Sequence, residues 1–181
     1  PERGRVGAGF GARAGMHQGG IGMASIVTQD GITISALAAV NSFGSVYMPG
    51  TDVFWAWPYE IDSEFGGQQP NPDLRVAAED WGDAKSNPAI GQNTTIACVA
   101  TDADLTPSET QRVANMALAG FARAIRPVFA PFDGDAVFAL STGETLPPEP
   151  RAHSLARIGE CAASTLARSI ASGVWHANRK D

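Results

Sequence analysis

The dipeptide Asn93-Thr94 places a nucleophilic side chain directly after a peptide bond that it can attack. A threonine hydroxyl held against the preceding carbonyl in a strained turn can add to it. An N→O acyl shift then forms an ester, and hydrolysis releases a new amino terminus. The α-amine of such a terminus has an ordinary pKa of about 7.7–8.0, so it can act as a base near neutral pH. Threonine activated by its own terminal amine is an established nucleophile. These residue types therefore fit self-cleavage followed by amide hydrolysis.

Plainer interpretations of the same residues stay open. The run Asn93-Thr94-Thr95 fits the Asn-x-Thr acceptor pattern of glycosylation, which matters only in a secreted protein. Asn93 is also a common turn residue before a strand, and Thr94 and Thr95 are good strand formers. A glycosylation acceptor or a simple turn would each account for the three residues without catalysis.

The elements around this dipeptide can be read from their patterns. Residues 94–103 form an apolar strand after a long polar loop, 49–92, and a loop of that length inside a domain is usually functional or flexible. A helix is predicted over residues 105–127, where Thr106 is the N-cap, Glu109 completes a capping box and Pro127 ends it. Its apolar stripe at a 3.6-residue period consists of Val113, Met116, Ala117, Gly120, Phe121 and Ala124.

The flanking segments complete an α+β pattern. Residues 24–44 predict a hairpin, because Asp30-Gly31 separates two β-rich runs. Residues 133–142 predict a turn and a strand, and residues 151–175 a second helix. The apolar face of this helix comprises Leu155, Ile158, Ala162, Leu166 and Ile170. The elements do not alternate regularly as strand, helix and strand, which favours largely antiparallel sheets.

The glycine-rich block, residues 4–22, contains eight glycines. Such a density of glycine allows positive φ angles and close backbone approach. A dinucleotide-binding loop would need a strand before it and a helix after it, and neither is predicted here. We therefore do not expect a dinucleotide site.

Composition excludes several classes. The chain has 181 residues, enough for one domain or two small ones, and a net charge of −6, which argues against nucleic-acid binding. Only two lysines occur, Lys85 and Lys180, which excludes most lysine-based mechanisms. Cys98 and Cys161 are expected to be buried thiols. No apolar run is long enough to span a membrane, and no signal peptide is recognisable, so a cytoplasmic location is expected. Because the sequence starts at Pro1 without a methionine, a further upstream segment is an expectation.

Several blocks of the sequence, in order, resemble the DmpA-type self-processing hydrolases, which include L-aminopeptidases/D-esterases, β-aminopeptidases and nylon-oligomer hydrolases. The blocks are "GRVGAGFGARAG", "GGIGMAS", "AAVNSFG" and the run from "GQNTTIACVATDADLTPSET" through "FDGDAVFALSTG". They cover residues 4–46 and 89–174. The resemblance implies a four-layer α/β/β/α sandwich, an α+β fold of the N-terminal-nucleophile type also found in ornithine acetyltransferases.

The resemblance also assigns roles to individual residues. Asn93-Thr94 matches the site of self-cleavage, so Thr94 is the implied nucleophile, with residues 1–93 ending the α piece and 94–181 forming the β piece of one domain. Asn41 matches an asparagine that supports the oxyanion. Asp133 and Asp135 match an acidic pair that could orient the hydroxyl and ammonium of Thr94. Taken alone, Asn41 is equally a strand-end residue, and Asp133-Gly134-Asp135 a plain turn.

Two departures from the family pattern stand out. Some relatives carry a lysine near the glycine-rich block, whereas this chain has Met16-His17-Gln18 there, and no lysine matches that position. A lone loop histidine such as His17 is more often exposed to solvent than catalytic. The long segment that precedes the glycine-rich block in the family is absent, so a missing N-terminal segment or a partner piece is expected.

The implied function is an aminopeptidase or amidase acting through an acyl-enzyme on Thr94, with a peptide or small amide as its substrate. One alternative is endo-cleavage of nylon-type polyamide oligomers. Acyl transfer and a non-enzymatic binding domain are rivals from other classes. No cofactor or metal is implied, because His17, His153 and His176 lack ligand spacing. A homo-oligomer is expected, with the aromatic residues Trp55, Trp57 and Tyr59 on another subunit or at the pocket rim.

Overall fold

A computed structural model describes residues 2–86 and 93–179. Its centre is a four-stranded sheet in the order β3-β4-β5-β6. The hairpin β3 (Gly20–Val27) and β4 (Thr33–Val40) is antiparallel, β5 (Ile96–Ala103) pairs antiparallel with β4, and β6 (Ala136–Thr145) runs parallel to β5. The predicted α+β class with a largely antiparallel sheet is confirmed.

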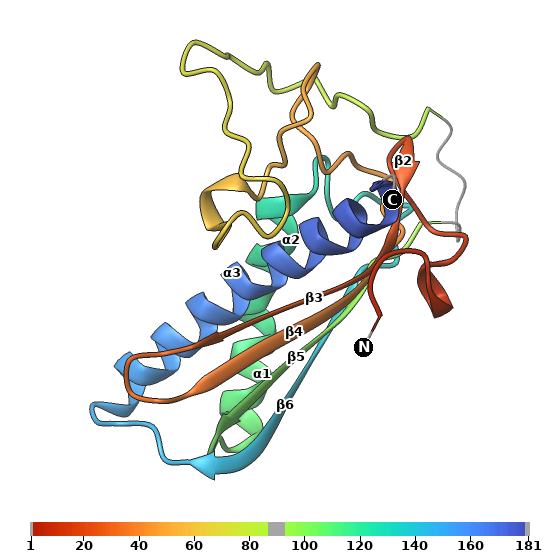
Figure 1. Cartoon of the computed structure of the whole chain (residues 1–181). Helices are drawn as coiled ribbons and strands as arrows, with labels where there is room; N and C mark the ends of the chain where they lie inside the picture. The colour runs from red at the N-terminus through yellow and green to blue at the C-terminus, as the bar shows by residue number, and fades with distance from the viewer. Residues whose placement is uncertain (1, 87–92, 180–181) are drawn as a thin grey trace.

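Three helices cover one face of this sheet (Figure 1). They are α1 (Pro107–Ala117), α2 (Ala119–Ala124) and α3 (Arg151–Asn178). The predicted capping box is present, since Glu109 and Thr106 each satisfy a backbone N–H of the other. The helix predicted over 105–127 is interrupted at Leu118, next to Gly120, where a side chain would strike the carbonyl of Ala163 in α3.

Helix α3 lies unusually close to β3 because both present glycine at the crossing. A methyl group built on Gly22 would overlap the carbonyl oxygen of Ser169, and one built on Gly173 would come within 2.9 Å of the Gly22 nitrogen. The predicted stripe of α3 fills the adjacent space: Ile158, Ala162, Leu166 and Ile170 are fully buried, and Leu155 is half-buried. Close packing of this kind fixes the helix on the sheet.

The glycine-rich block forms short elements that the sequence did not predict. They are the 3-10 turn η1 (Gly7–Gly9) and the small hairpin of β1 (Arg13–Ala14) and β2 (His17–Gln18). The block packs along β3: Gly4 and Ile21 exchange two backbone hydrogen bonds of 2.7 and 2.8 Å. Some of its glycines serve close backbone approach, as predicted: a side-chain carbon on Gly9, Gly19 or Gly20 would lie within 2.6 Å of a backbone atom.

The long loop runs across one end of the molecule, beyond the sheet, and most of its described residues after Phe65 are exposed to solvent (Figure 1). Of the predicted loop 49–92, residues 87–92 lie outside the described part of the chain, and the rest contains one 3-10 turn, η2 (Trp57–Tyr59). Arg168 of α3 holds the loop through two hydrogen bonds to the carboxylate of Glu64, and it donates a third to the carbonyl of Ser25 in β3. Two hydrogen bonds between one guanidinium and one carboxylate require a defined geometry, so the pair of Arg168 and Glu64 fixes the loop at α3.

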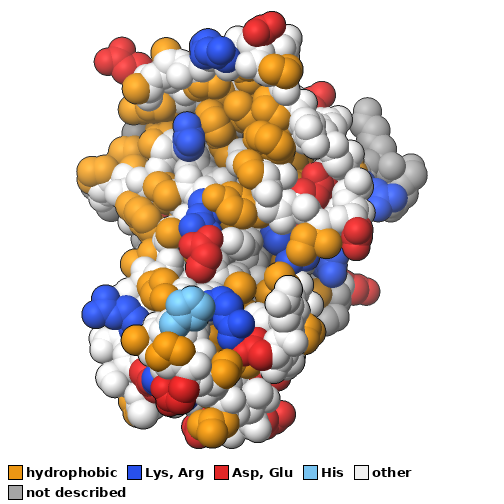
Figure 2. Space-filling model, turned by 90° about the vertical axis from the view of Figure 1, so that its left-hand side faces the viewer, with side chains coloured by type: hydrophobic (Ala, Val, Ile, Leu, Met, Phe, Trp, Pro, Cys, Tyr) orange, Lys and Arg blue, Asp and Glu red, His pale blue; other side chains and the backbone are white. Residues whose placement is uncertain are grey.

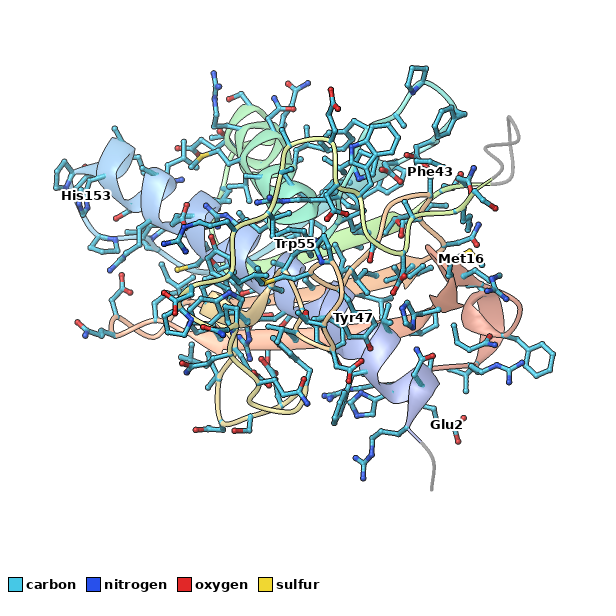
Figure 3. All side chains as sticks on the ribbon, turned by 90° about the horizontal axis from the view of Figure 1, so that it is seen from above. Glu2, Met16, Phe43, Tyr47, Trp55 and His153 are labelled. Carbon is cyan, nitrogen blue, oxygen red and sulfur yellow. The ribbon has the colours of Figure 1, made fainter. Side chains whose placement is uncertain are left out.

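One of the aromatic residues expected at a subunit contact or at the pocket rim, Trp55, is buried in its own chain instead. Trp55 is 9% exposed and lies under the guanidinium of Arg126, whose central carbon is 3.9 Å from the ring centroid. Trp57 and Tyr59 are half-buried, and Arg123 covers the Tyr59 ring. Figure 3 likewise places Trp55 above the helices near the middle of the molecule. Trp55 thus packs within its own chain.

The second face of the sheet carries an exposed apolar row. Met23, Leu37, Cys98 and Phe138 are register partners across the four strands, and Leu37 and Phe138 are 44% and 60% exposed. Cys98 and Cys161 are free thiols but only half-buried, which corrects the expectation of buried ones. For Cys98 the reason is its place on this uncovered face. The helical and sheet layers described here correspond to one half of a four-layer sandwich.

The surface seen in Figure 2, which looks at the left-hand side of Figure 1, mixes charges of both signs. Lys and Arg side chains are interspersed there with Asp and Glu side chains. Among the described residues, no helix is long and apolar enough to cross a membrane.

We expect Gly22→Ala to destabilise the fold by about 1–3 kcal/mol, the usual cost of overpacking. Its methyl group would push α3 off β3. Thermal or denaturant unfolding measures the effect, and Gly11→Ala is the matched control, because a methyl group there meets no atom within 4 Å. Equal stability of both variants would contradict the close crossing.

Candidate functional site

The residues singled out by sequence meet at one end of the sheet. Asn41 directly follows β4, Thr94 lies two residues before β5, and Asp133 and Asp135 precede β6. Because β4 runs antiparallel to β5 and β5 runs parallel to β6, the end of β4 and the starts of β5 and β6 lie at the same end of the sheet. An isolated bridge between Asn93 and Asp133 extends the pairing to the site.

The peptide bond between Asn93 and Thr94 is fixed by backbone hydrogen bonds on both sides. Its N–H donates to the carbonyl oxygen of Asn41 at 3.0 Å, and its carbonyl oxygen accepts from the N–H of Gly134 at 2.9 Å. The Thr94 hydroxyl donates to that same carbonyl oxygen at 2.5 Å. The peptide carbonyl is therefore polarised, and the hydroxyl lies beside it.

Gly134 is required by the space around the hydroxyl. A side-chain carbon at this position would lie 2.7 Å from Thr94 Oγ1. The close approach brings the Gly134 N–H onto the Asn93 carbonyl while leaving room for the hydroxyl. The middle residue of Asp133-Gly134-Asp135 thus does more than form a turn.

The side chain of Asn41 is held by the glycine-rich block, at a cavity that it shares with Thr94. Its Oδ1 accepts from the backbone N–H of Arg13 at 3.0 Å, so the amide nitrogen points away from that strand. Asn41 and Thr94 line a shared cavity of about 310 Å³. The other lining residues are small or apolar: Ala8, Gly11, Ala12, Ala39 and Ile96.

Two cavities of about 400 Å³ lie elsewhere. One is at the end of α3 beside Tyr47 and Trp175, and the other on the uncovered sheet face beside Leu37 and Cys98. Neither contains a residue that sequence reasoning connected with catalysis. The smaller cavity at Thr94 is therefore the better candidate for substrate binding.

Asp133 is half-buried and held by the backbone. Its two carboxylate oxygens accept from the N–H groups of Phe43 and Ala130, each at 3.3 Å. Burial raises the pKa of Asp133, while these hydrogen bonds and the charge on Lys85 act in the opposite direction.

Asp135 binds the residue after the nucleophile. Its Oδ1 accepts from the N–H of Thr95 at 2.7 Å, and Thr95 is fully buried. Burial raises the pKa of Asp135, and the neighbouring charge of Asp133 adds to the rise. In the uncut chain both carboxylates accept hydrogen bonds from backbone N–H groups, and their expected role in orienting Thr94 stays a prediction.

Lys85 is a site residue that sequence reasoning missed. Its Nζ donates to Oδ1 of Asn93 at 2.8 Å, and Asn93 is 2% exposed. Burial lowers the pKa of Lys85; Arg13 adds to this effect and Asp133 opposes it. A lysine does lie at the site, reaching it from the long loop rather than from the glycine-rich block. The available signal was its rarity and its position eight residues before Asn93.

His17 lies beside the site without contacting Thr94. Its Nε2 pairs with Asp83 Oδ2 at 3.0 Å, and its ring meets Tyr47 edge-on at 4.6 Å. Among the described residues, no cluster of three or more His, Cys, Asp or Glu side chains could hold a metal ion. His17 thus ties the loop to the glycine-rich block.

Comparison with known proteins places this arrangement in a family. The model of peptidase family S58 matches residues 1–181. An uncharacterized aminopeptidase of Mycobacterium tuberculosis is 40% identical over 188 residues, which cover 96% of this chain and 53% of that protein. The chain thus spans about half the length of this relative.

Solved structures share the fold. A β-aminopeptidase of Burkholderia sp. has a TM-score of 0.64 at 22% identity, covering 96% of this chain and 46% of that one. An L-aminopeptidase D-Ala-esterase/amidase of Ochrobactrum anthropi, described as a variant of the Ntn-hydrolase fold, has a TM-score of 0.61 at 21% identity, covering 96% and 44%. The expected N-terminal-nucleophile fold and the resemblance to this family are confirmed.

We expect Asp135→Asn to raise the melting temperature at pH 7. A raised pKa means that the folded state disfavours the carboxylate, so the charge costs stability above the folded pKa, and this cost disappears below the unfolded pKa of about 3.9. Asparagine keeps an acceptor for the Thr95 N–H. For a chain of this size, a difference of about 1 kcal/mol in the free energy of unfolding shifts the melting temperature by roughly 2–4 °C.

Melting curves between pH 3.5 and pH 8 test this expectation. The difference between Asp135→Asn and the parent should shrink as the pH falls, whereas Asp73→Asn, at an exposed loop position, should show no such trend. A lower melting temperature of Asp135→Asn at pH 7 would show that the carboxylate stabilises the fold.

Proposed function

The chain belongs to peptidase family S58, and from this premise we propose that it is part of an aminopeptidase-type hydrolase that cuts itself between Asn93 and Thr94. Thr94 then serves as the nucleophile. The observation that carries the proposal is the Thr94 hydroxyl, placed beside a carbonyl that the Gly134 N–H polarises.

The cut is an N→O acyl shift followed by hydrolysis. The Thr94 hydroxyl oxygen adds to the Asn93 carbonyl carbon, and negative charge develops on the oxygen that accepts from Gly134. The carbon–nitrogen bond breaks, the hydroxyl proton passes to the Thr94 nitrogen, and an ester remains. Water then cleaves the ester to leave the Asn93 carboxylate and a free α-amine on Thr94. A fixed N–H aimed at developing charge is the usual means of stabilising such a step.

Turnover uses the groups that the cut exposes. The neutral α-amine of Thr94 accepts the proton of its own hydroxyl, and the oxygen attacks an amide carbonyl in the adjoining cavity. The released amine takes the proton, and water later hydrolyses the acyl-enzyme. The Asn41 amide, oriented by Arg13, donates to the oxyanion. Removal of such a donor costs about 3–4 kcal/mol in other enzymes.

The acidic pair holds the nucleophile in place. Asp135 anchors the Thr95 N–H and so fixes the backbone on one side of Thr94. Asp133 fixes the chain at Phe43, two residues after Asn41. Once the α-amine exists, both carboxylates become candidate partners for it.

Rival functions are less favoured by these observations. Membership in a peptidase family favours hydrolysis over acyl transfer and over a binding-only domain. Endo-cleavage of polyamide oligomers would use the same machinery and differs only in substrate. The proposal also includes a division into residues 1–93 and 94–181, a further segment or partner piece over the uncovered sheet face, homo-oligomeric assembly and a cytoplasmic location.

Thr94→Ala should leave the chain uncut, and Thr94→Ser should still be cut, because serine keeps the hydroxyl. Intact-mass measurement and N-terminal sequencing read the outcome. The parent is expected to yield a piece that starts Thr-Thr-Ile. Active protein without a Thr94 terminus would refute the proposal.

Gly134→Ala should slow the cut by at least about tenfold, since its methyl group would displace the Thr94 hydroxyl while the backbone N–H to Asn93 remains. A time course of cleavage after cell-free synthesis measures the rate. An unchanged melting temperature would show that the fold is preserved. Cleavage at the parental rate would mean that the hydroxyl attacks from another position.

A further inference from the structure

We propose that Lys85 is a positioning residue for the self-cleavage step, acting by holding the side chain of Asn93. The inference rests on the proposed function and adds one residue to it. This residue is not the nucleophile, and it is not part of the acidic pair or of the oxyanion site. The starting point is the 2.8 Å hydrogen bond from Lys85 Nζ to Asn93 Oδ1.

Asn93 needs support of this kind because its main chain is the reacting group. The Gly134 N–H fixes its carbonyl oxygen, and the Asn41 carbonyl fixes the N–H of the following residue. The Lys85 ammonium adds a third point of attachment, on the side chain. With all three in place, the Asn93 carbonyl cannot rotate away from the hydroxyl of Thr94. Misplacement of a reacting group by about 1 Å can lower a rate by roughly 10²-fold.

Lys85 is itself anchored, so it can act as a fixed support. Its backbone N–H donates to the carbonyl of Phe43 at 3.0 Å, two residues after Asn41. Two residues earlier, the Asp83 carbonyl accepts from the N–H of Met16 at 2.8 Å, and the Asp83 carboxylate pairs with His17. The loop segment before the cut is thus tied to the glycine-rich block and to the end of β4.

The charges around Lys85 fit a donor rather than a solvent-facing cation. Lys85 is half-buried, its charge interacts with Asp133, and Arg13 lies near enough to repel it. Asp133 in turn holds Phe43, whose carbonyl binds the Lys85 backbone. The lysine therefore contacts Asn93 and interacts electrostatically with Asp133, which itself forms a backbone bridge with Asn93.

The test compares cleavage rates after cell-free synthesis, followed by intact mass. Lys85→Met removes the donor but keeps an unbranched side chain, and should slow the cut by about tenfold or more. Lys85→Arg retains a donor and should recover part of the rate. Arg75→Met is the matched control, since it removes an exposed cation from the same loop. Melting temperatures verify that each variant is folded.

A double-mutant cycle separates positioning from general structural support. If Lys85 acts through Asn93, the pair Lys85→Met and Asn93→Ala should cut no more slowly than Asn93→Ala alone. Additive losses, or a parental rate in Lys85→Met, would overturn the inference while leaving the proposed function intact. A parent chain that is never cut at Asn93–Thr94 would overturn the proposed function and this inference together.

Discussion

The geometry of the site depends on two backbone hydrogen bonds across the Asn93–Thr94 peptide, one to the Asn41 carbonyl and one from the Gly134 N–H. They continue the pairing of β5 with β4 and β6 beyond the last regular ladder position. The register of the sheet therefore fixes the position of the reacting peptide. The hydroxyl needs only one torsion, that of a β-branched side chain, to lie at the carbonyl.

Electrostatics at this end of the sheet are balanced among partly buried groups. Burial disfavours the charged forms of Asp133, Asp135 and Lys85 alike, whereas the attraction between Lys85 and Asp133 favours both of their charges. Backbone N–H groups supply the rest of the compensation for the carboxylates. Such a site is held together by pairs of groups that each depend on the other, so changes within it should not be additive.

Local patterns in the sequence were enough to predict the longer regular elements, though not the short ones of the glycine-rich block or the break at Leu118. Three of these patterns follow short-range rules, and the predicted element is present in each case. They are the Asp30-Gly31 turn, the Thr106 capping box and the apolar stripe of residues 151–175. Asn41, Thr94, Asp133 and Asp135 could be singled out because strand ends and the family pattern coincide, and the fold brings them to one end of the sheet. Lys85 and Trp55 were not, since the loop that carries them has no periodicity. Its path is set by long-range contacts such as Arg168 with Glu64 and Asp83 with Met16. Cys98 was misjudged because alternation along a strand does not reveal whether the second face is covered.

The position of the proposed cut within the sheet has a consequence for the life of the molecule. It falls between β4 and β5, which are hydrogen-bonded neighbours, while α3 from the later piece packs chiefly on β3 and β4 of the earlier one. Neither piece contains a complete hydrophobic core by itself. The two pieces of a cut chain would therefore stay packed together. They would have folded before the cut as one continuous chain, in a unimolecular reaction. Once fully denatured, the cut chain could return only by association of two different polypeptides, so its recovery would depend on concentration, and its native state would persist mainly through slow unfolding.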